Sequence, residues 1–257
     1  MRMSRLMSSI GAGLLALTLP RHGASATEPY RVLAPSDGTP HGAVLLVPGC
    51  SGFVALEGVN LYDERASELR DAGYLVVFVD YLGPRYLGNC GHVSHAEVAR
   101  DILETAAWTR RQAGIHPGRI SVIGWSYGGG GVLAALRAMP PGPPAFQKAV
   151  MYYPDCRRAM PWTTTDVSVL MFMGEADDVA RPAFCDPVVK AAPPDSLRAV
   201  RYPNAHHAFD QWSLPERARY PFGTLGYNAE AAQDSWASAL DFLNRRRAGR
   251  AGAAEHP

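Results

Sequence analysis

Short and almost wholly apolar runs recur along this chain, with room for a helix or a long loop between one run and the next. AVLLV at 43–47 and YLVVFV at 74–79 have the length of strands and lack the polar alternation of a half-exposed strand. Strands that are apolar on both faces are typical of parallel sheets with helices on both sides. Similar runs stand at 120–123, 149–153, 167–173 and 197–202.

Helix signals fill several of the intervals between these runs. Asn60 predicts the start of a helix that ends at Gly73, and Ser94 with Glu97 forms a capping box that opens another. A final amphipathic helix is predicted from Asn228. This alternation of strands and helices predicts an α/β fold with a mostly parallel central sheet and helices on both faces.

The composition suits one large core. Hydrophobic residues make up 47% of the 257 residues and charged residues 19%, and no internal repeat divides the chain. We expect one domain over residues 27–244, between a signal peptide at 1–26 and a flexible tail at 245–257. The formal net charge of +1 gives no electrostatic reason to expect a nucleic acid or an acidic membrane as partner.

The first residues have the three parts of a secretory signal peptide. Two arginines precede Leu6, the stretch from Leu6 to Leu19 is apolar and uncharged, and Ala24-Ser25-Ala26 is an A-x-A cleavage site. The apolar stretch is too short to span a membrane, and no cysteine near Ala26 offers a lipid anchor. We therefore expect an exported protein, periplasmic or extracellular, without stable membrane insertion.

Export changes the meaning of the four cysteines. An even number in an oxidising compartment predicts disulfides, and the lack of a C-x-x-C pair argues against a zinc or thioredoxin-type site. The cysteines follow predicted strands or the loops after them, so all four are expected at the carboxyl edge of the sheet. We predict the pairs Cys50–Cys90 and Cys156–Cys185, with four free thiols as the alternative.

The sequence GWSYG at 124–128 stands between the apolar run 120–123 and a helical segment. In α/β sheets the loops at the carboxyl ends of the strands form the ligand crevice. A sharp turn from strand to helix through a serine needs small residues two positions before and after it, here Gly124 and Gly128. The pattern indicates that Ser126 is a nucleophile. The alternative is a glycine-rich turn that only eases packing.

A serine hydroxyl needs a general base that is itself oriented by a carboxylate. After such a turn the acid is expected before the histidine in the chain. His206 and His207 follow the last predicted strand and are the candidate bases. The acidic residues after the preceding strand are the candidate acids, of which at most one is catalytic: Glu175, Asp177 and Asp178.

The loop after the first apolar run is the expected source of a second oxyanion donor. In PGCSG at 48–52 the candidate is the backbone N–H of Cys50, which would act together with the N–H of Tyr127. His92 and His95 have the spacing of two metal ligands, but no third ligand of matching pattern accompanies them. We therefore predict neither a metal nor a cofactor.

The motifs VPGCSG, GYLVVFVDYLGPR, VIGWSYGGG, GEADD and YPNAHHAFD, in this order, resemble the dienelactone hydrolase family of α/β-hydrolases over nearly all of the chain after the signal peptide. The resemblance implies the α/β-hydrolase fold, with Asp177 as the acid and His207 as the base beside Ser126. The archetypes of the family carry a cysteine nucleophile and a glutamate in the oxyanion loop. Ser126 and Gly49-Cys50 replace them here, which favours a more ordinary ester as substrate.

The resemblance also implies a substrate site. Arg85 resembles an arginine that contacts the substrate carboxylate in the family, with a solvated loop arginine as the alternative. Four aromatic residues are candidates for lining the pocket, although core packing is the better explanation for any one of them: Trp125, Tyr152, Tyr153 and Trp162. We predict an exported serine hydrolase that cleaves small-molecule esters or lactones through an acyl-enzyme. The run GWSYGGGG also resembles cutinase-like polyester hydrolases, and a non-catalytic binding protein of the same fold is a further alternative.

Overall fold

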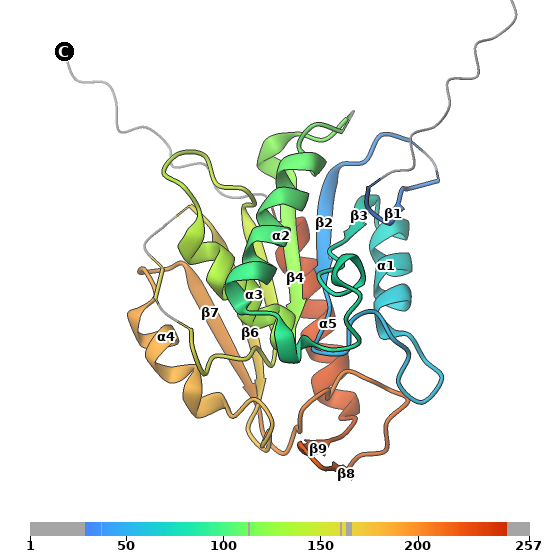
Figure 1. Cartoon of the computed structure of the whole chain (residues 1–257), viewed down its shortest axis with the longest axis vertical. Helices are drawn as coiled ribbons and strands as arrows, with labels where there is room; N and C mark the ends of the chain where they lie inside the picture. The colour runs from blue at the N-terminus through green and yellow to red at the C-terminus, as the bar shows by residue number, and fades with distance from the viewer. Residues whose placement is uncertain (1–28, 37, 113, 160, 163–165, 246–257) are drawn as a thin grey trace, which may run out of the picture.

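A computed structural model describes residues 29–245, apart from 37, 113, 160 and 163–165 (Figure 1). The predicted signal peptide and nearly all of the predicted tail lie outside these residues. Within this described part of the chain, no helix has both the length and the apolar character needed to cross a membrane.

Seven strands form the central sheet, in the order β1-β3-β2-β4-β5-β6-β7. The strand β1 pairs with β3 in antiparallel fashion, and every other neighbouring pair is parallel. The mostly parallel sheet predicted from the apolar runs is therefore confirmed. The strands are β1 (Val32–Leu33), β2 (Gly42–Val47), β3 (Tyr74–Phe78), β4 (Ile120–Trp125), β5 (Lys148–Tyr152), β6 (Ser168–Gly174) and β7 (Leu197–Tyr202).

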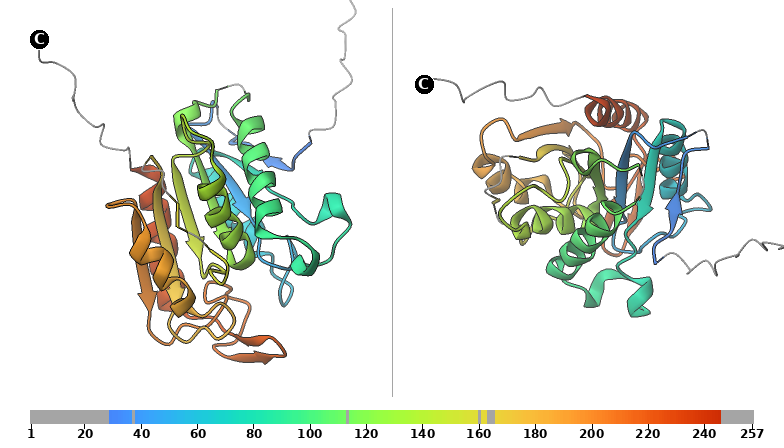
Figure 2. Two further views of the ribbon diagram at one scale, coloured as in Figure 1. Left: turned by 60° about the vertical axis from the view of Figure 1, so that its left-hand side comes forward. Right: turned by 90° about the horizontal axis from the view of Figure 1, so that it is seen from above.

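Helices cover both faces of this sheet (Figure 2). The α-helices are α1 (Leu61–Asp71), α2 (His95–Thr109), α3 (Ser126–Ala138), α4 (Asp186–Ala191) and α5 (Ala229–Asn244). Short 3-10 helices are η1 (Gly83–Arg85), η2 (Cys90–His92), η3 (Pro117–Arg119) and η4 (Pro182–Phe184). Helices α2, α3 and α4 pack on one face and α1 and α5 on the other. Alternate residues of β2 point to the two faces, which explains why strands of this kind are apolar throughout.

The predicted caps start their helices. The side chain of Asn60 accepts hydrogen bonds from the first turn of α1. Ser94 and Glu97 form the reciprocal capping box of α2, and Asn228 caps α5. Each cap satisfies backbone N–H groups that have no partner inside the helix. The start of each of these helices thus follows from one residue and its side-chain oxygen.

A small antiparallel hairpin was not among the predicted elements. It consists of β8 (Ala218–Tyr220) and β9 (Gly223–Leu225), and Figure 1 shows it at the bottom of the molecule. Two strands of three residues each are too short to give a periodic hydrophobic pattern, so the sequence carries little signal for them. The hairpin matters because its turn carries Phe222, which reaches the cavity described below.

Two disulfides join Cys50 to Cys90 and Cys156 to Cys185. These are the pairs that the sequence predicts. The first links the loop after β2 to η2, and the second links the loop after β5 to the segment before α4. Both lie at the carboxyl edge of the parallel strands, where the predicted site residues also lie.

Candidate active site

Ser126 stands at the bend between β4 and α3. Its φ of +49° is a conformation that non-glycine residues rarely adopt, and it belongs to the sharp turn that the sequence predicts. The turn leaves no room for side chains on either side. A Cβ on Gly124 would lie 2.9 Å from the carbonyl oxygen of Gly128, and a Cβ on Gly128 would lie 2.3 Å from the carbonyl oxygen of Pro48. Glycine is therefore required at both positions.

The next glycines have a different role. A Cβ on Gly130 would lie 2.6 Å from His95 Nε2, and one on Gly131 would lie 2.3 Å from Val98 Cγ1. His95 and Val98 belong to α2, so these glycines let α2 and α3 approach each other closely. The packing explanation thus applies to the extra glycines of the run, and the turn geometry to the pair around Ser126.

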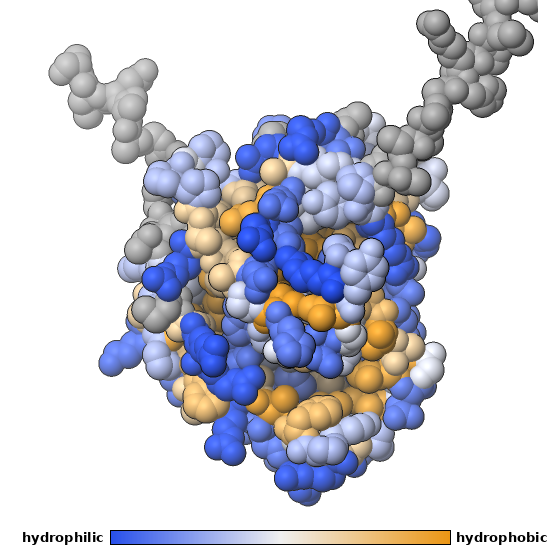
Figure 3. All heavy atoms as spheres, viewed as in Figure 1, coloured by the Kyte–Doolittle hydropathy of each residue, from blue (hydrophilic) through white to orange (hydrophobic). Residues whose placement is uncertain are grey.

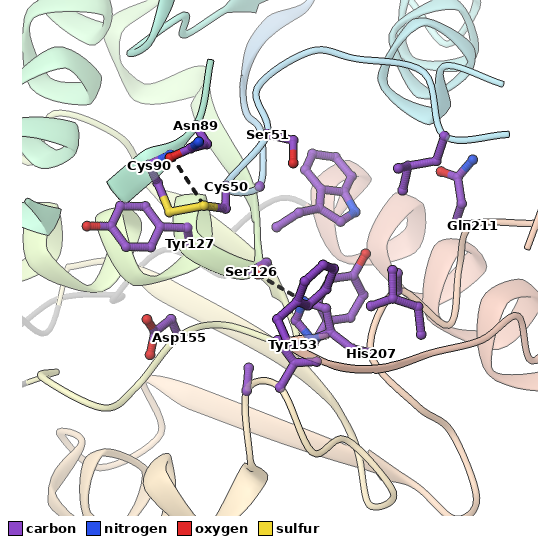
Figure 4. A pocket seen from close by; sticks show the side chains of 18 of the residues that line it. Cys50, Ser51, Asn89, Cys90, Ser126, Tyr127, Tyr153, Asp155, His207 and Gln211 are labelled. Atoms are coloured by element: carbon purple, nitrogen blue, oxygen red, sulfur yellow. Dashed lines mark hydrogen bonds between the residues drawn. A yellow bond between two sulfur atoms is a disulfide. The ribbon is translucent and has the colours of Figure 1, made fainter. Parts of the chain in front are cut away.

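His207 connects Ser126 to a buried carboxylate. Its Nε2 lies 2.9 Å from Ser126 Oγ (Figure 4). Its Nδ1 lies 2.7 Å from Asp177 Oδ2. Asp177 is almost fully buried, and its other oxygen accepts the N–H groups of Val179 and Ala180 at 2.8 Å each. The three groups follow β4, β6 and β7, whose carboxyl ends the parallel sheet brings to the same edge.

The neighbouring residues His206 and Asp178 point elsewhere. His206 Nδ1 lies 2.9 Å from the carbonyl oxygen of Ala176. Asp178 accepts hydrogen bonds from Thr224 of β9 and from Arg219 of β8. The hydrogen bond from the Thr224 N–H is the main reason why the pKa of Asp178 is lowered. The structure therefore joins Asp177 and His207 to Ser126, and ties the adjacent acid to the β8–β9 hairpin.

The loop after β2 lies beside Ser126 and is fixed by several contacts. Gly49 donates its N–H to the buried Tyr62 hydroxyl at 2.9 Å, and its carbonyl accepts the Tyr81 hydroxyl at 2.6 Å. The carbonyl of Cys50 accepts the N–H of Cys90 at 2.8 Å, in addition to the disulfide. Burial raises the pKa of the Tyr62 hydroxyl, so this group stays neutral. The N–H of Cys50 has no acceptor among the residues that the structure describes.

The N–H of Tyr127, in the first turn of α3, likewise has no acceptor in the described part of the chain. Its side chain is anchored elsewhere, since the hydroxyl donates to the carbonyl of Val93. The ring also packs on His95, with 4.2 Å between the centroids. Burial lowers the pKa of His95, so this ring is neutral at neutral pH. Two free N–H groups, of Cys50 and Tyr127, thus flank the serine.

A second buried carboxylate, Asp210, lies three residues after His207. It accepts hydrogen bonds from Trp125 Nε1 at 2.9 Å and from the Tyr153 hydroxyl at 2.6 Å. Trp125 precedes the serine, and the Tyr153 ring packs on the His207 ring with centroids 4.6 Å apart. Asp210 therefore ties together residues beside Ser126 and His207. Asp210 was not among the residues predicted from the sequence, although an acid in an aromatic run, HAFDQW at 207–212, is a signal for a buried carboxylate.

Ser126 and His207 lie in a cavity of about 500 Å³ (Figure 4). Of the four aromatic residues predicted to line the cavity, Trp125 and Tyr153 do line it. Tyr152 and Trp162 are buried in the core and are not among its lining residues.

Arg85 does not line the cavity either. Its guanidinium makes two hydrogen bonds to Asp101, at 2.6 and 3.0 Å, and one to the carbonyl of Tyr81. The prediction that Arg85 contacts a substrate therefore finds no support in its position. The described residues hold no cluster of His, Cys, Asp and Glu suited to a metal ion.

The chain shares its sequence pattern and its fold with known hydrolases. The model of the dienelactone hydrolase family matches residues 31–246. A protein of Klebsiella pneumoniae classed as a dienelactone hydrolase is 19% identical, with a TM-score of 0.63 over 84% of this chain and 92% of its own. A dienelactone hydrolase-like promiscuous phosphotriesterase from metagenomic libraries is 20% identical, with a TM-score of 0.59 over 80% of this chain and 87% of its own.

Esterase 2 of Thermogutta terrifontis, solved after phosphorylation by paraoxon, is also similar. It is 17% identical, with a TM-score of 0.55 over 82% of this chain and 86% of its own. At such identities the likeness to these solved structures concerns the fold. No curated protein matches this chain by sequence.

Proposed function

Since the chain belongs to the dienelactone hydrolase family, we propose that it is an exported serine hydrolase that cleaves carboxylic esters or lactones through an acyl-enzyme. The observation that carries the proposal is the pair of contacts made by His207, 2.9 Å to Ser126 Oγ and 2.7 Å to Asp177, at a cavity large enough for a small ester. The free N–H groups beside the serine support it as well.

In the acylation step, Ser126 Oγ attacks the ester carbonyl while His207 Nε2 takes the hydroxyl proton. Asp177 holds the Nδ1–H of the ring and stabilises the imidazolium that forms. The carbonyl oxygen becomes an oxyanion, and the N–H groups of Cys50 and Tyr127 donate hydrogen bonds to it. When the tetrahedral intermediate collapses, the bond to the alcohol oxygen breaks and His207 protonates the leaving alcohol.

Deacylation repeats these steps with water as the nucleophile. His207 takes a proton from the water as its oxygen attacks the acyl carbon, and it returns a proton to Ser126 as the acid product leaves. With a lactone the alcohol and the acid belong to one product molecule. Every proton transfer runs through the same nitrogen, so the reaction needs only the groups already named.

Replacing Ser126 tests the proposal directly. We expect Ser126→Ala to lower kcat for p-nitrophenyl acetate on the order of 10³-fold or more, with some residual activity from the oxyanion donors. Ser51, which lines the same cavity, provides the matched control, and Ser51→Ala should keep its activity within about tenfold. A Ser126→Ala variant that retains a tenth of the activity contradicts the assignment.

A fluorophosphonate probe separates an enzyme from a binding protein of the same fold. Esterase 2 of Thermogutta terrifontis was solved phosphorylated by paraoxon, and a similar phosphorus reagent should label this chain if Ser126 is activated. We expect mass spectrometry to place the label on Ser126. Wild-type protein that binds esters without turning them over, and that takes no label, is the result expected of a binding protein.

Export is the part of the proposal that rests on residues 1–26. The two disulfides support it, because disulfides persist in oxidising compartments. Protein isolated from the periplasm or the medium should begin at Thr27, after the Ala24-Ser25-Ala26 site. N-terminal sequencing checks this. A mature protein that retains Met1 contradicts it.

A further inference from the structure

The charged side chains at the cavity neutralise each other. Apart from His207 and tyrosines, the ionisable lining residues in the described chain are Asp155 and Arg157. Arg157 donates from Nε and Nη2 to the two oxygens of Asp155, at 2.9 and 2.7 Å. Asp155 also accepts the backbone N–H of Arg157 at 3.1 Å. An anionic group that approached Arg157 would meet the Asp155 carboxylate beside it.

Other polar groups in the cavity do not replace a free cation. The side-chain amide of Gln211 donates to the carbonyl of Val59 and to Ser213. Arg85, whose counterpart in the resemblance contacts a substrate carboxylate, is paired with Asp101 away from the cavity. A carboxylate in the cavity would therefore lose its hydration without gaining a counter-charge, which is costly.

The mouth of the cavity, in contrast, exposes large apolar side chains. Val54, Leu56 and Phe222 all line the cavity, and they are 49%, 37% and 62% exposed. They come from two separate places, the loop after β2 and the turn of the β8–β9 hairpin. Figure 3 shows apolar residues around a hollow in the lower half of the molecule. Covering such apolar surface at a site entrance with an apolar group of the substrate removes it from water, which stabilises the complex.

Building on the proposed function, we propose that the substrates are neutral esters whose extended apolar group reaches from Ser126 to the rim formed by Val54, Leu56 and Phe222. The neutral pair Asp155–Arg157 selects against a carboxylate or phosphate on the substrate. The rim residues favour longer apolar groups over short ones.

Two pairs of substrates with matched shape test the selection against charge. The first pair is p-nitrophenyl hexanoate and the p-nitrophenyl monoester of adipic acid, which differ at the end of the acyl chain. The second is pentyl acetate and 5-acetoxypentanoate, which differ at the end of the alcohol. We expect the neutral member of each pair to have a kcat/KM about 100-fold higher or more. Equal or faster hydrolysis of either anionic member overturns the proposal.

A substitution in the rim tests the proposed preference for longer apolar groups. We expect Phe222→Ser to lower kcat/KM for p-nitrophenyl hexanoate about tenfold more than it lowers kcat/KM for p-nitrophenyl acetate. The control is Tyr86→Ser, because Tyr86 is an exposed aromatic residue that does not line the cavity. The same loss on both esters, or no loss on the hexanoate, overturns the role of the rim. If wild-type protein hydrolyses neither ester and takes no fluorophosphonate label, the proposed function itself has failed.

Discussion

Three non-glycine residues at the site have a positive φ: Ser126 at 49°, Tyr153 at 36° and Ala208 at 57°. Each such conformation costs on the order of 1–3 kcal/mol and persists only where the surroundings impose it. The three residues are the candidate nucleophile, the tyrosine whose ring packs on His207, and the residue that follows His207. At this site, the strain thus falls on groups whose relative positions the proposed reaction needs.

Single substitutions can check which histidine is the base and which aspartate is the acid. We predict that His207→Ala lowers kcat on the order of 10³-fold, while His206→Ala stays within about tenfold, because only the His207 ring reaches Ser126. For the acid, we expect Asp177→Ala to be inactive or nearly so, and Asp178→Ala to remain active. Steady-state kinetics on a p-nitrophenyl ester measure all four. An inactive His206→Ala beside an active His207→Ala shifts the assignment by one residue.

Asp210 gives a prediction about stability. Asp210→Ala leaves the Trp125 N–H and the Tyr153 hydroxyl buried without a partner, which should lower the free energy of unfolding by about 2–4 kcal/mol. The control is Asp234→Ala, since Asp234 accepts a tyrosine hydroxyl, that of Tyr202, at an exposed position. Its loss should stay within about 1 kcal/mol. Urea unfolding measures both, and equal losses contradict the role given to burial.

At the scale of the elements, the close packing of α2 on α3 depends on glycine. A methyl group on Gly131 would lie 2.3 Å from Val98 Cγ1. Alanine gains about 1 kcal/mol of helix propensity over glycine, but overpacking typically costs about 1–3 kcal/mol, so we predict that Gly131→Ala is net destabilising. In a Val98→Ala background the same substitution should cost less, and a double-mutant cycle in urea measures the difference. A stabilising Gly131→Ala would show that the two helices separate at little cost.

The elements that the sequence predicts are those whose residues carry the signal themselves. Asn60 and Ser94 cap their helices with their own side chains, and the continuous apolar run of β2 records burial on both faces. The β8–β9 hairpin is different, because it is held by Asp178 of another loop, which binds Thr224 and Arg219. A contact between residues distant in the chain leaves no local pattern, so the hairpin and its Phe222 could not be predicted.

The candidate site likewise has features that could be predicted from the sequence and features that could not. The turn at Ser126 is visible because sterics demand glycines at fixed positions around it. The choice of Asp177 over Asp178 came from the family resemblance, since two adjacent acids look alike in a sequence. The pairings of Arg85 with Asp101 and of Asp155 with Arg157 depend on the folded arrangement. The charge of the cavity, and with it the class of substrate, therefore required the structure.

For the whole molecule, the parallel sheet brings distant segments to one edge and the disulfides hold them there. The bridges Cys50–Cys90 and Cys156–Cys185 span 40 and 29 residues of chain. In the chain-entropy model each constrains the unfolded chain by about 4 kcal/mol, so their effects on stability are closely matched. Only the first touches the loop whose Cys50 N–H is the proposed oxyanion donor. The two bridges therefore separate a general effect on stability from a specific effect on the reaction.

We predict that replacing both Cys50 and Cys90 by serine lowers the free energy of unfolding by about as much as replacing both Cys156 and Cys185. At a temperature where both variants are folded, only the first should lose kcat, by about tenfold or more, because the oxyanion loop is no longer tied to η2. Urea unfolding and steady-state kinetics on the two double variants measure this. Equal kcat values mean that the hydrogen bonds from Tyr81 to Gly49 and from Cys90 to Cys50 hold the loop without the bridge. Four thiols that react with an alkylating agent in the unfolded, unreduced wild-type protein contradict the bridges themselves.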